Sequence, residues 1–363
     1  MVRCILCGFL CTLALFFTLR GLWATDNGEI SFFADQTEVF FRDGSIVKRY
    51  DGNVTVAYKN MTLTAGKAVY YETEKKVELV GNVCVRDTSK TIEADSITYL
   101  VEEKKVIANG HVLIQRKGQW LSSDRAVYLK AGNQIIASGG VQLIDPTEQI
   151  TVTGGQAEYD LETKAAVITD HPKLLKAETK RGKNLIVTAR QLEFHSEDKK
   201  VIASQDVHIS RERMNAICGK MIYLQAEERL ILQNTPEVIG LRSGAAEEIL
   251  KGDTIEIAIK DGQVNEVIVI GKATGKTVGV DGGEVSEVSG QKVSLQFKDE
   301  ELQRITVQGN ATSIYRFFRA EDSEREINEV SGDTVQFFFR EGELYRVLVT
   351  GGAMGIYSSS SKF

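Results

Sequence analysis

Apolar residues along this chain recur in a frame of eight positions that returns about every thirty residues. The frame reads apolar, any, small, any, any, apolar, any, aromatic. It fits residues 63–70 (LTAGKAVY), 92–99 (IEADSITY), 121–128 (LSSDRAVY), 152–159, 187–194 and 216–223, and more loosely 32–39, 250–257, 288–295 and 330–337. A repeat of this period is typical of solenoids and related arrays. The pattern therefore predicts an array of about ten units of about thirty residues each.

The spacing inside the unit predicts strands rather than helices. Apolar residues at positions 1, 3, 6 and 8 of the frame fit no helical stripe, but they fit two alternating strand segments separated by one extra residue. A bulge or a sharp bend supplies such an extra residue. The second half of each unit alternates more regularly, as from Val106 through Gly110 to Ile114, and a glycine inside a strand marks a bend. Each unit is predicted to hold two bent strands, joined by polar turns such as 72–76 and 102–105.

The distance between the small residue of the first strand and the bend residue of the second divides the array into two groups. It is 16 positions in six units, from Ala65 to Gly81 through Cys218 to Asn234, and 19 in the last three, from Gly252 to Gly271 through Gly332 to Gly351. We therefore predict a first repeat domain at 30–240, a second, diverged one at 244–357, and a polar tail at 358–363. The longer intervals at 275–283 and 319–329 predict protruding loops.

Composition and the N-terminus place the protein outside the cytoplasm. The apolar share of 42% is enough for a continuous core, and a formal charge of −6 argues against nucleic-acid binding. Residues 1–24 combine an early Arg3, an apolar run at 4–19 and Ala24, which is the pattern of an export signal. Retention of this segment as an inner-membrane anchor is the alternative. Outside the leader, Cys84 and Cys218 lie four units apart, too far for a disulfide, so both are predicted to be free thiols.

The repeated tracts ADSITYL (94–100) and SSDRAVYL (122–129), with Gly81-Asn82-Val83 and its variants following sixteen residues after the small residue, resemble the organic-solvent-tolerance (OstA-like) family. That family includes the periplasmic lipopolysaccharide-transport protein A (LptA) and the N-terminal domain of the translocon LptD. The resemblance covers most of 32–240 and, more loosely, 250–355. It implies an all-β fold: an elongated, folded-over antiparallel sheet of the β-taco or jelly-roll-like type, whose apolar inside carries acyl chains.

On this resemblance the protein is a periplasmic lipid-transfer bridge that carries lipopolysaccharide or a related glycolipid towards the outer membrane. The residues expected to line its groove are Leu63, Ala68, Tyr70, Val83, Val85, Ile92, Ile97, Tyr99, Val106, Val112, Ile114, Ala126, Tyr128, Val141 and Leu143. The unpaired strands at the two ends, near 32–33 and 347–357, are expected to pair with inner- and outer-membrane transport components or head to tail with another copy.

Other functional classes find little support in the sequence. Residues 271–277 (GKATGKT) resemble a phosphate-binding loop but have Ile270 where its first glycine belongs, and no helix is expected after them. The four histidines have no metal-ligand spacing, and no nucleophile stands beside a base. We therefore expect no enzyme activity, metal or cofactor. The alternatives are a structural or adhesive β-solenoid with a closed core, and an inner-membrane-anchored assembly factor of the same pathway.

Overall fold

The computed structural model describes residues 30–58, 60–88, 90–116, 118–178, 183–211, 214–241, 247–260, 263–278, 285–299, 301–319, 324–341 and 343–360. The predicted leader at 1–24 lies outside these ranges. The described residues form antiparallel β-strands, together with one short 3-10 helix, η3 (Gln225–Glu227). They divide into two compact units. The N-terminal unit runs to Glu178 and includes 190–199, and the C-terminal unit comprises 179–189 and 200–363.

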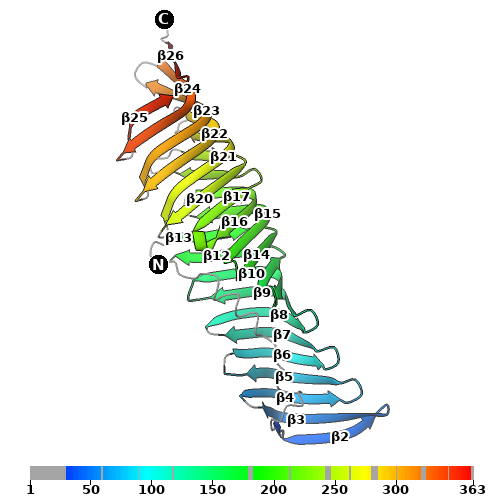
Figure 1. Ribbon diagram of the computed structural model, residues 1–363. Coiled ribbons are helices and arrows are strands. Elements are labelled where there is room, and N and C mark those ends of the chain that lie inside the picture. The colour runs from blue at the N-terminus through cyan, green and yellow to red at the C-terminus, as the bar shows by residue number, and fades with distance from the viewer. Residues whose placement is uncertain are drawn as a thin grey trace. The chain divides into compact units, whose positions relative to one another are not determined.

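In the N-terminal unit, consecutive strands from β3 to β10 pair in antiparallel order, as the blue-to-green arrows of Figure 1 show. The strands of this unit are β1 (Ile30–Phe33), β2 (Gln36–Arg42), β3 (Ser45–Tyr58), β4 (Met61–Tyr71), β5 (Lys76–Arg86), β6 (Lys90–Leu100), β7 (Lys105–Arg116), β8 (Gln119–Leu129), β9 (Gln134–Asp145), β10 (Ile150–Asp160), β11 (Ala165–Thr169), β12 (Lys173–Glu178) and β14 (Gln191–His195). One end of β10 pairs with β11 and its other end with β12, so β11 and β12 are the two halves of one bent strand.

The C-terminal unit continues the same antiparallel plan with longer strands. Its elements are β13 (Lys183–Thr188), β15 (Lys200–Arg211), β16 (Met214–Leu224), β17 (Arg229–Gln233), β18 (Glu237–Leu241), β19 (Glu247–Lys251), β20 (Thr254–Lys260), β21 (Gln263–Val278), β22 (Val285–Lys298), β23 (Glu301–Arg319), β24 (Glu324–Arg340), β25 (Glu343–Thr350) and β26 (Met354–Ser360). The long strand β24 pairs with β25 along one half and with β26 along the other.

Every second strand bends at two consecutive residues with left-handed φ. At the bend of β7, Gly110 has φ 74° and His111 has φ 45°. The bends are Gly52–Asn53, Gly81–Asn82, Gly110–His111, Gly139–Gly140, Asp170–His171, Gln205–Asp206, Asn234–Thr235, Gly271–Lys272, Gly309–Asn310 and Gly351–Gly352. Two such residues change the backbone twist locally, and the register of the strand pairing shifts there. In β7 the shift lies between Asn109 and Val112. The predicted bend positions are confirmed.

The strands bury one face of the sheet on both sides of the bend. In β7, the side chains of Val106, Ala108, Val112 and Ile114 are buried, whereas those between them are not. We call the face that carries these four residues, and their cross-strand partners, the interior face. No helix or second layer covers this face among the described residues, so the two arms of each bent strand must bury it against each other. The folded-over, all-β antiparallel sheet predicted from the sequence is confirmed.

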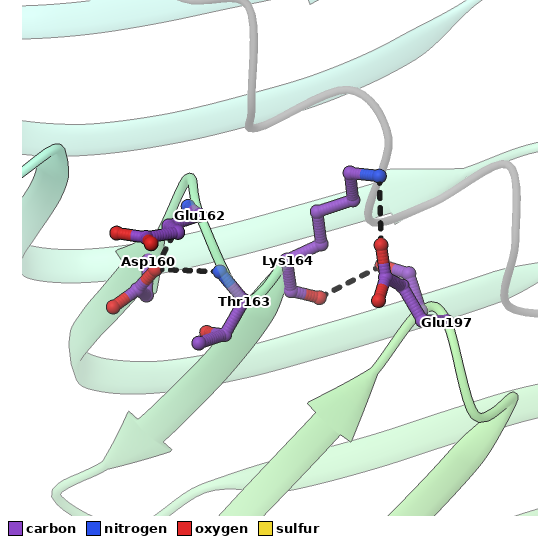
Figure 2. Close-up of polar contacts among 6 residues, drawn as sticks. Asp160, Glu162, Thr163, Lys164 and Glu197 are labelled. Atoms are coloured by element: carbon purple, nitrogen blue, oxygen red, sulfur yellow. Dashed lines mark hydrogen bonds and ion pairs between the residues drawn. The ribbon is translucent and has the colours of Figure 1, made fainter.

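Turns at one edge of the arms extend the hydrogen-bond ladder of the N-terminal unit. The backbone N–H groups of Val101, Lys130 and Leu161 each donate to a carbonyl of the preceding turn. In Figure 2, Asp160 Oδ1 accepts hydrogen bonds of 2.8 Å from the backbone N–H groups of Glu162 and Thr163, which closes the turn between β10 and β11. Stacked turns of this kind hold the arm edges in register.

Parts of the loops predicted at 275–283 and 319–329 are strands. Residues 275–278 belong to β21, Arg319 ends β23, and residues 324–329 belong to β24, so the prediction is wrong for these stretches. Both pair along their length, as Thr277 does with Ser286 and Glu326 with Phe317. Residues 279–283 and 320–323 lie outside the described residues. The predicted domain boundary at 240–244 falls beside 242–246, which lie outside the described residues.

Candidate functional site: the interior face

All fifteen predicted groove residues lie on the interior face of the N-terminal unit. Pairing between adjacent strands places them in rows across the sheet, because antiparallel partners point to the same face. One row runs Leu63, Val85, Ile92, Ile114, Leu121, Leu143; a second runs Ala68, Leu79, Ile97, Ala108, Ala126, Ala137; a third runs Tyr70, Val77, Tyr99, Val106, Tyr128, Ile135. Val83, Val112 and Val141 lie next to the bend in their own strands. The structure therefore brings these residues together as a single apolar surface.

This surface is closed along the middle of the N-terminal unit. Twelve of the fifteen residues are buried, and Val112, Val106 and Ala126 are at most 1% exposed. The Ala68 row contains several small residues, such as Ala108 opposite Ala126, and lies between two rows of larger side chains, which lets the two arms approach closely. An acyl chain could lie on such a surface only if the arms moved apart.

Aromatic side chains mark one edge of the interior face. Tyr70, Tyr99 and Tyr128 are half-buried at the strand ends that lie away from the bends. They alternate with Val77 and Val106 in the same row. Burial raises the pKa of Tyr99, and the nearby Tyr128 raises it further. The three tyrosines carry a polar tip at the edge of an apolar surface, an arrangement suited to the boundary between lipid chains and water.

Charged side chains mark the other edge, and sequence analysis missed them. Lys90 and Arg116 continue the interior orientation of Ile92 and Ile114 and are direct cross-strand partners. Lys90 is buried, which lowers its pKa, and Asp87 lies 3.5 Å from its ammonium group and partly offsets that effect. One sequence signal could have found them. The alternation of inward and outward positions continues past Ile92 and Ile114, which puts Lys90 and Arg116 on the interior face. The interior face is thus apolar in the middle, with tyrosines at one edge and charges at the other.

Two further buried polar groups complete the charged edge. The Gln119 side-chain amide donates a hydrogen bond to the Asp145 carboxylate. Asp145 also accepts hydrogen bonds from the backbone N–H groups of Thr147, at 2.9 Å, and Glu148, at 3.0 Å. Burial raises the pKa of Glu148, and the Asp145 charge adds to this effect. These contacts fix the turn between β9 and β10 against the charged edge.

The same face is open where the strands run out. In the N-terminal unit, Val39 of β2 shares a cross-strand row with Lys48 and Tyr70, yet its side chain is exposed. In the C-terminal unit, Val347 of β25 pairs with Phe337 and is 43% exposed, and Tyr357 of β26 is 63% exposed. Each unit therefore has one edge at which the interior face meets solvent.

The described residues give no sign of the other chemistries considered for the sequence. Residues 271–277 lie within β21, so they form a strand and not a phosphate-binding loop. In the ranges described, no three His, Cys, Asp or Glu side chains gather where they could hold a metal ion. Cys84 and Cys218 are free thiols, as predicted. No helix within the described ranges has the length and apolar character needed to cross a membrane.

Comparison with known proteins finds a matching family and similar solved structures. The family model described as "LptA/(LptD N-terminal domain) LPS transport protein" matches residues 25–105 and 91–263, more than half of the chain. The crystal structure of LptH from Pseudomonas aeruginosa is described as the LptA-homologous periplasmic component of the lipopolysaccharide transport device. It is 17% identical, with 32% of this chain and 94% of that chain covered, at a TM-score of 0.28. The search of curated proteins gave no match.

Proposed function

Because the chain belongs to the family of LptA and LptD N-terminal-domain lipopolysaccharide transport proteins, we propose that it is a periplasmic carrier that holds the acyl chains of lipopolysaccharide, or of a related glycolipid, on its interior face. The observation that carries this proposal is the set of apolar cross-strand rows through Leu63, Ala68 and Tyr70. The rows repeat without one distinctive position, so bound cargo would meet similar surroundings at each step along the unit.

The free-energy barrier to lipid transfer through water explains why such a surface is needed. An acyl chain of about twelve carbons costs on the order of 10 kcal/mol to expose to water, at about 0.8 kcal/mol for each methylene. A multi-chain lipid therefore cannot cross an aqueous compartment at a useful rate unless its chains are sheltered. The apolar rows would provide that shelter, since they bear no charge between the tyrosines and the Lys90 edge.

The closed middle of the interior face requires the arms to separate when cargo binds. Separation exposes as much apolar surface as the acyl chains then cover, so little net free energy is lost. The open edges at β2 and at β25–β26 are where acyl chains would first meet the interior face. We propose that cargo enters at such an edge and that its chains then replace arm-to-arm contacts in the middle.

The same edges are the proposed contacts with neighbouring components. The unpaired side of an edge strand offers backbone N–H and C=O groups to a strand of another protein. Inner- and outer-membrane transport components, or another copy of this chain, are the proposed partners. The proposed location is the periplasm, with the segment 1–24 serving as an export signal or, in the alternative, as an anchor.

Photocrosslinking tests the cargo assignment. A photoreactive amino acid at the interior positions Val83 or Val112 should give adducts with lipopolysaccharide in the cell envelope. The same probe at the neighbouring positions Cys84 or Leu113, which have the opposite orientation, should give none. The readout is the lipid mass on the purified protein. Adducts at both faces, or at neither in a folded and exported protein, would contradict the proposal.

A structural β-solenoid with a closed core is a second candidate, and one observation favours it. The interior residues Val112 and Ala126 are as fully buried as those of an ordinary protein core. Such a protein would bind no lipid, and its interior would never open. The purified protein distinguishes the two: lipopolysaccharide should bind in about one-to-one amount to a carrier and not at all to a closed solenoid.

A further inference from the structure

An arginine-rich surface lies on the outer face of the C-terminal unit, opposite the interior face of β22–β25. Cross-strand pairing defines three rows there: Lys292, Gln308, Thr334, Thr350; Ser294, Thr306, Gln336, Leu348; and Gln296, Arg304, Phe338, Arg346. Cations are the only charged residues at these twelve positions. The chain as a whole has a formal charge of −6, so the charge at these twelve positions has the opposite sign to that of the whole chain.

Guanidinium groups and aromatic rings are stacked across the third row. The Arg304 guanidinium lies 5.0 Å from the centre of the Phe338 ring, and the Arg346 guanidinium lies 5.3 Å from the same ring. The Arg340 guanidinium lies 4.8 Å from the Tyr345 ring. The two rings are themselves 6.4 Å apart. We call these five residues the arginine face.

Stacking leaves the arginines able to bind a further anion. A guanidinium lying on a ring uses its flat face, and its N–H donors point outward in the plane, where they can hold a phosphate or carboxylate in two-point fashion. Acids are near as well: Glu343 is the cross-strand partner of Arg340, Glu341 follows Arg340 in the chain, and Glu266 continues the third row beyond Gln296. Arg304, Arg340, Arg346 and Lys292 outnumber these three acids, and Lys298 and Glu301 are partners of opposite charge, so the face keeps a net positive charge.

An exposed aromatic side chain accompanies these charges. Tyr345 is 55% exposed and lies beside the Arg340 guanidinium. Its neighbour Leu344 is the cross-strand partner of Phe339 and belongs to the interior face. Positive charge beside an exposed tyrosine is what the boundary of an anionic lipid bilayer favours: each cation gains from the surface potential, and tyrosine places its ring among the headgroups. An acidic protein segment would explain the charges but not the projecting tyrosine ring.

We propose that the arginine face binds the surface of a membrane containing anionic lipids, with the headgroup phosphates held by Arg304, Arg340 and Arg346 and with Tyr345 set into the interface. This contact uses the outer face, whereas the proposed cargo site uses the interior face. It stands independently of the cargo proposal, since it would bring the C-terminal unit to a bilayer whatever the interior carries.

Vesicle co-sedimentation tests the proposal with the full chain. The wild type should bind vesicles of phosphatidylcholine with phosphatidylglycerol, and vesicles of phosphatidylcholine alone far less. The triple variant R304Q/R340Q/R346Q should bind the anionic vesicles about a hundredfold more weakly, because each cation contributes about a factor of five at such a surface. A matched control, R86Q/K104Q/R125Q, removes the same charge from exposed positions of the N-terminal unit and should bind as the wild type does.

Further variants separate charge from folding and from cargo binding. R304K/R340K/R346K keeps the charge and should retain binding within about threefold, and Y345S should lose about tenfold. Lipopolysaccharide binding should be the same in all of these. Unchanged vesicle binding by the triple Gln variant, an equal loss in the control, or equal binding to both kinds of vesicle would overturn the proposal, and none of these results bears on the interior cargo site.

Discussion

The interior face of β6–β9 and the interior face of β24–β26 are built from the same alternating pattern and the same left-handed bends, yet one is closed and the other open. Val112 is 1% exposed in the first region, and Val347 is 43% exposed in the second. Both point to the inside of a bent strand. The difference lies in their neighbours: β7 has a paired strand on each side, whereas β25 pairs with β24 on one side. An identical local pattern thus gives a core in one place and an accessible apolar surface in the other.

The comparison suggests how a repeat array can be stable and still accept lipid. The closed region supplies the stability, because each buried aliphatic side chain contributes about 1.5–3 kcal/mol. The edges supply access, because apolar groups there already face solvent and lose little when cargo covers them. If this division is right, the same substitution should have different effects in the two regions.

The largest expected difference comes from placing a charge on the interior face. Val112→Asp should lower the free energy of unfolding by more than about 4 kcal/mol, because the carboxylate would be buried without a partner. Val347→Asp, at an equivalent orientation on the edge strand, should change it by less than about 1 kcal/mol. Urea unfolding followed by circular dichroism measures both. Equal losses in the two variants would mean that the edge is as closed as the middle.

A smaller difference is expected at the bends. Gly110 and Gly351 both have left-handed φ, and in each case an added Cβ would overlap an aspartate from the neighbouring strand, Asp95 or Asp333. Gly110→Ala should cost about 2–3 kcal/mol, because the packed region cannot shift. Gly351→Ala should cost about 1 kcal/mol, since the edge strands can move. Gly118→Ala, which has left-handed φ but nothing within 4 Å, isolates the backbone strain.

A smaller effect is expected in thiol labelling, which compares the accessibility of the interior and outer faces directly. Burial raises the pKa of the Cys218 thiol to about 11, on the interior face, and also raises that of Cys84, which is half-buried on the outer face. We expect Cys84 to react with iodoacetamide at least about tenfold faster in the native protein. In urea the two rates should converge. Equal native rates would show that the interior around Cys218 opens freely without cargo.

The smallest effect concerns the outer side of a bend. A hydrogen bond of 2.9 Å from His111 to Asp95 raises the pKa of His111, and the Asp95 charge adds to it. A raised pKa means that the contact stabilises the bend at pH values below the ordinary histidine pKa, and that this is lost as the pH rises through the folded-state value. NMR titration should show His111 above its usual range, and Asp95→Asn should bring it back down. An unchanged pKa in that variant would assign the shift to another group.

Much of the fold could be predicted from the alternation and the bend spacing. The strands and all nine bends of the spacing rule follow from local pattern, because a period of two and a repeated insertion are encoded in consecutive residues. The antiparallel order was implied by the family resemblance. The bends at Gln205–Asp206 and Asn234–Thr235 contain no glycine. They were predicted only from their distance of 16 positions from the small residue of the preceding strand. Strand length was harder: polar residues at 275–278 and 324–329 looked like loops but extend long strands.

The candidate site was only partly predictable. The orientation of the fifteen groove residues follows from parity, but the closure of the two arms does not, because it depends on packing between residues that alternation cannot relate. The alternation that continues past Ile92 and Ile114 indicates the inward orientation of Lys90 and Arg116, but charged residues at a strand end are normally read as solvent-facing. Burial against the facing arm is a tertiary property, and no local signal reports it.

The most direct test of the central claim is to place the photoreactive group on the lipid instead of on the protein. Lipopolysaccharide with a diazirine in one acyl chain would be bound to the unmodified protein, illuminated, and the labelled residues identified by mass spectrometry. We predict adducts at Val106 and Val112 of the closed region and none at the adjacent, oppositely oriented Ile107 and Leu113. Adducts confined to β25 and β26, with none in β6–β9 although lipid binds, would contradict the claim that the closed interior opens to receive cargo.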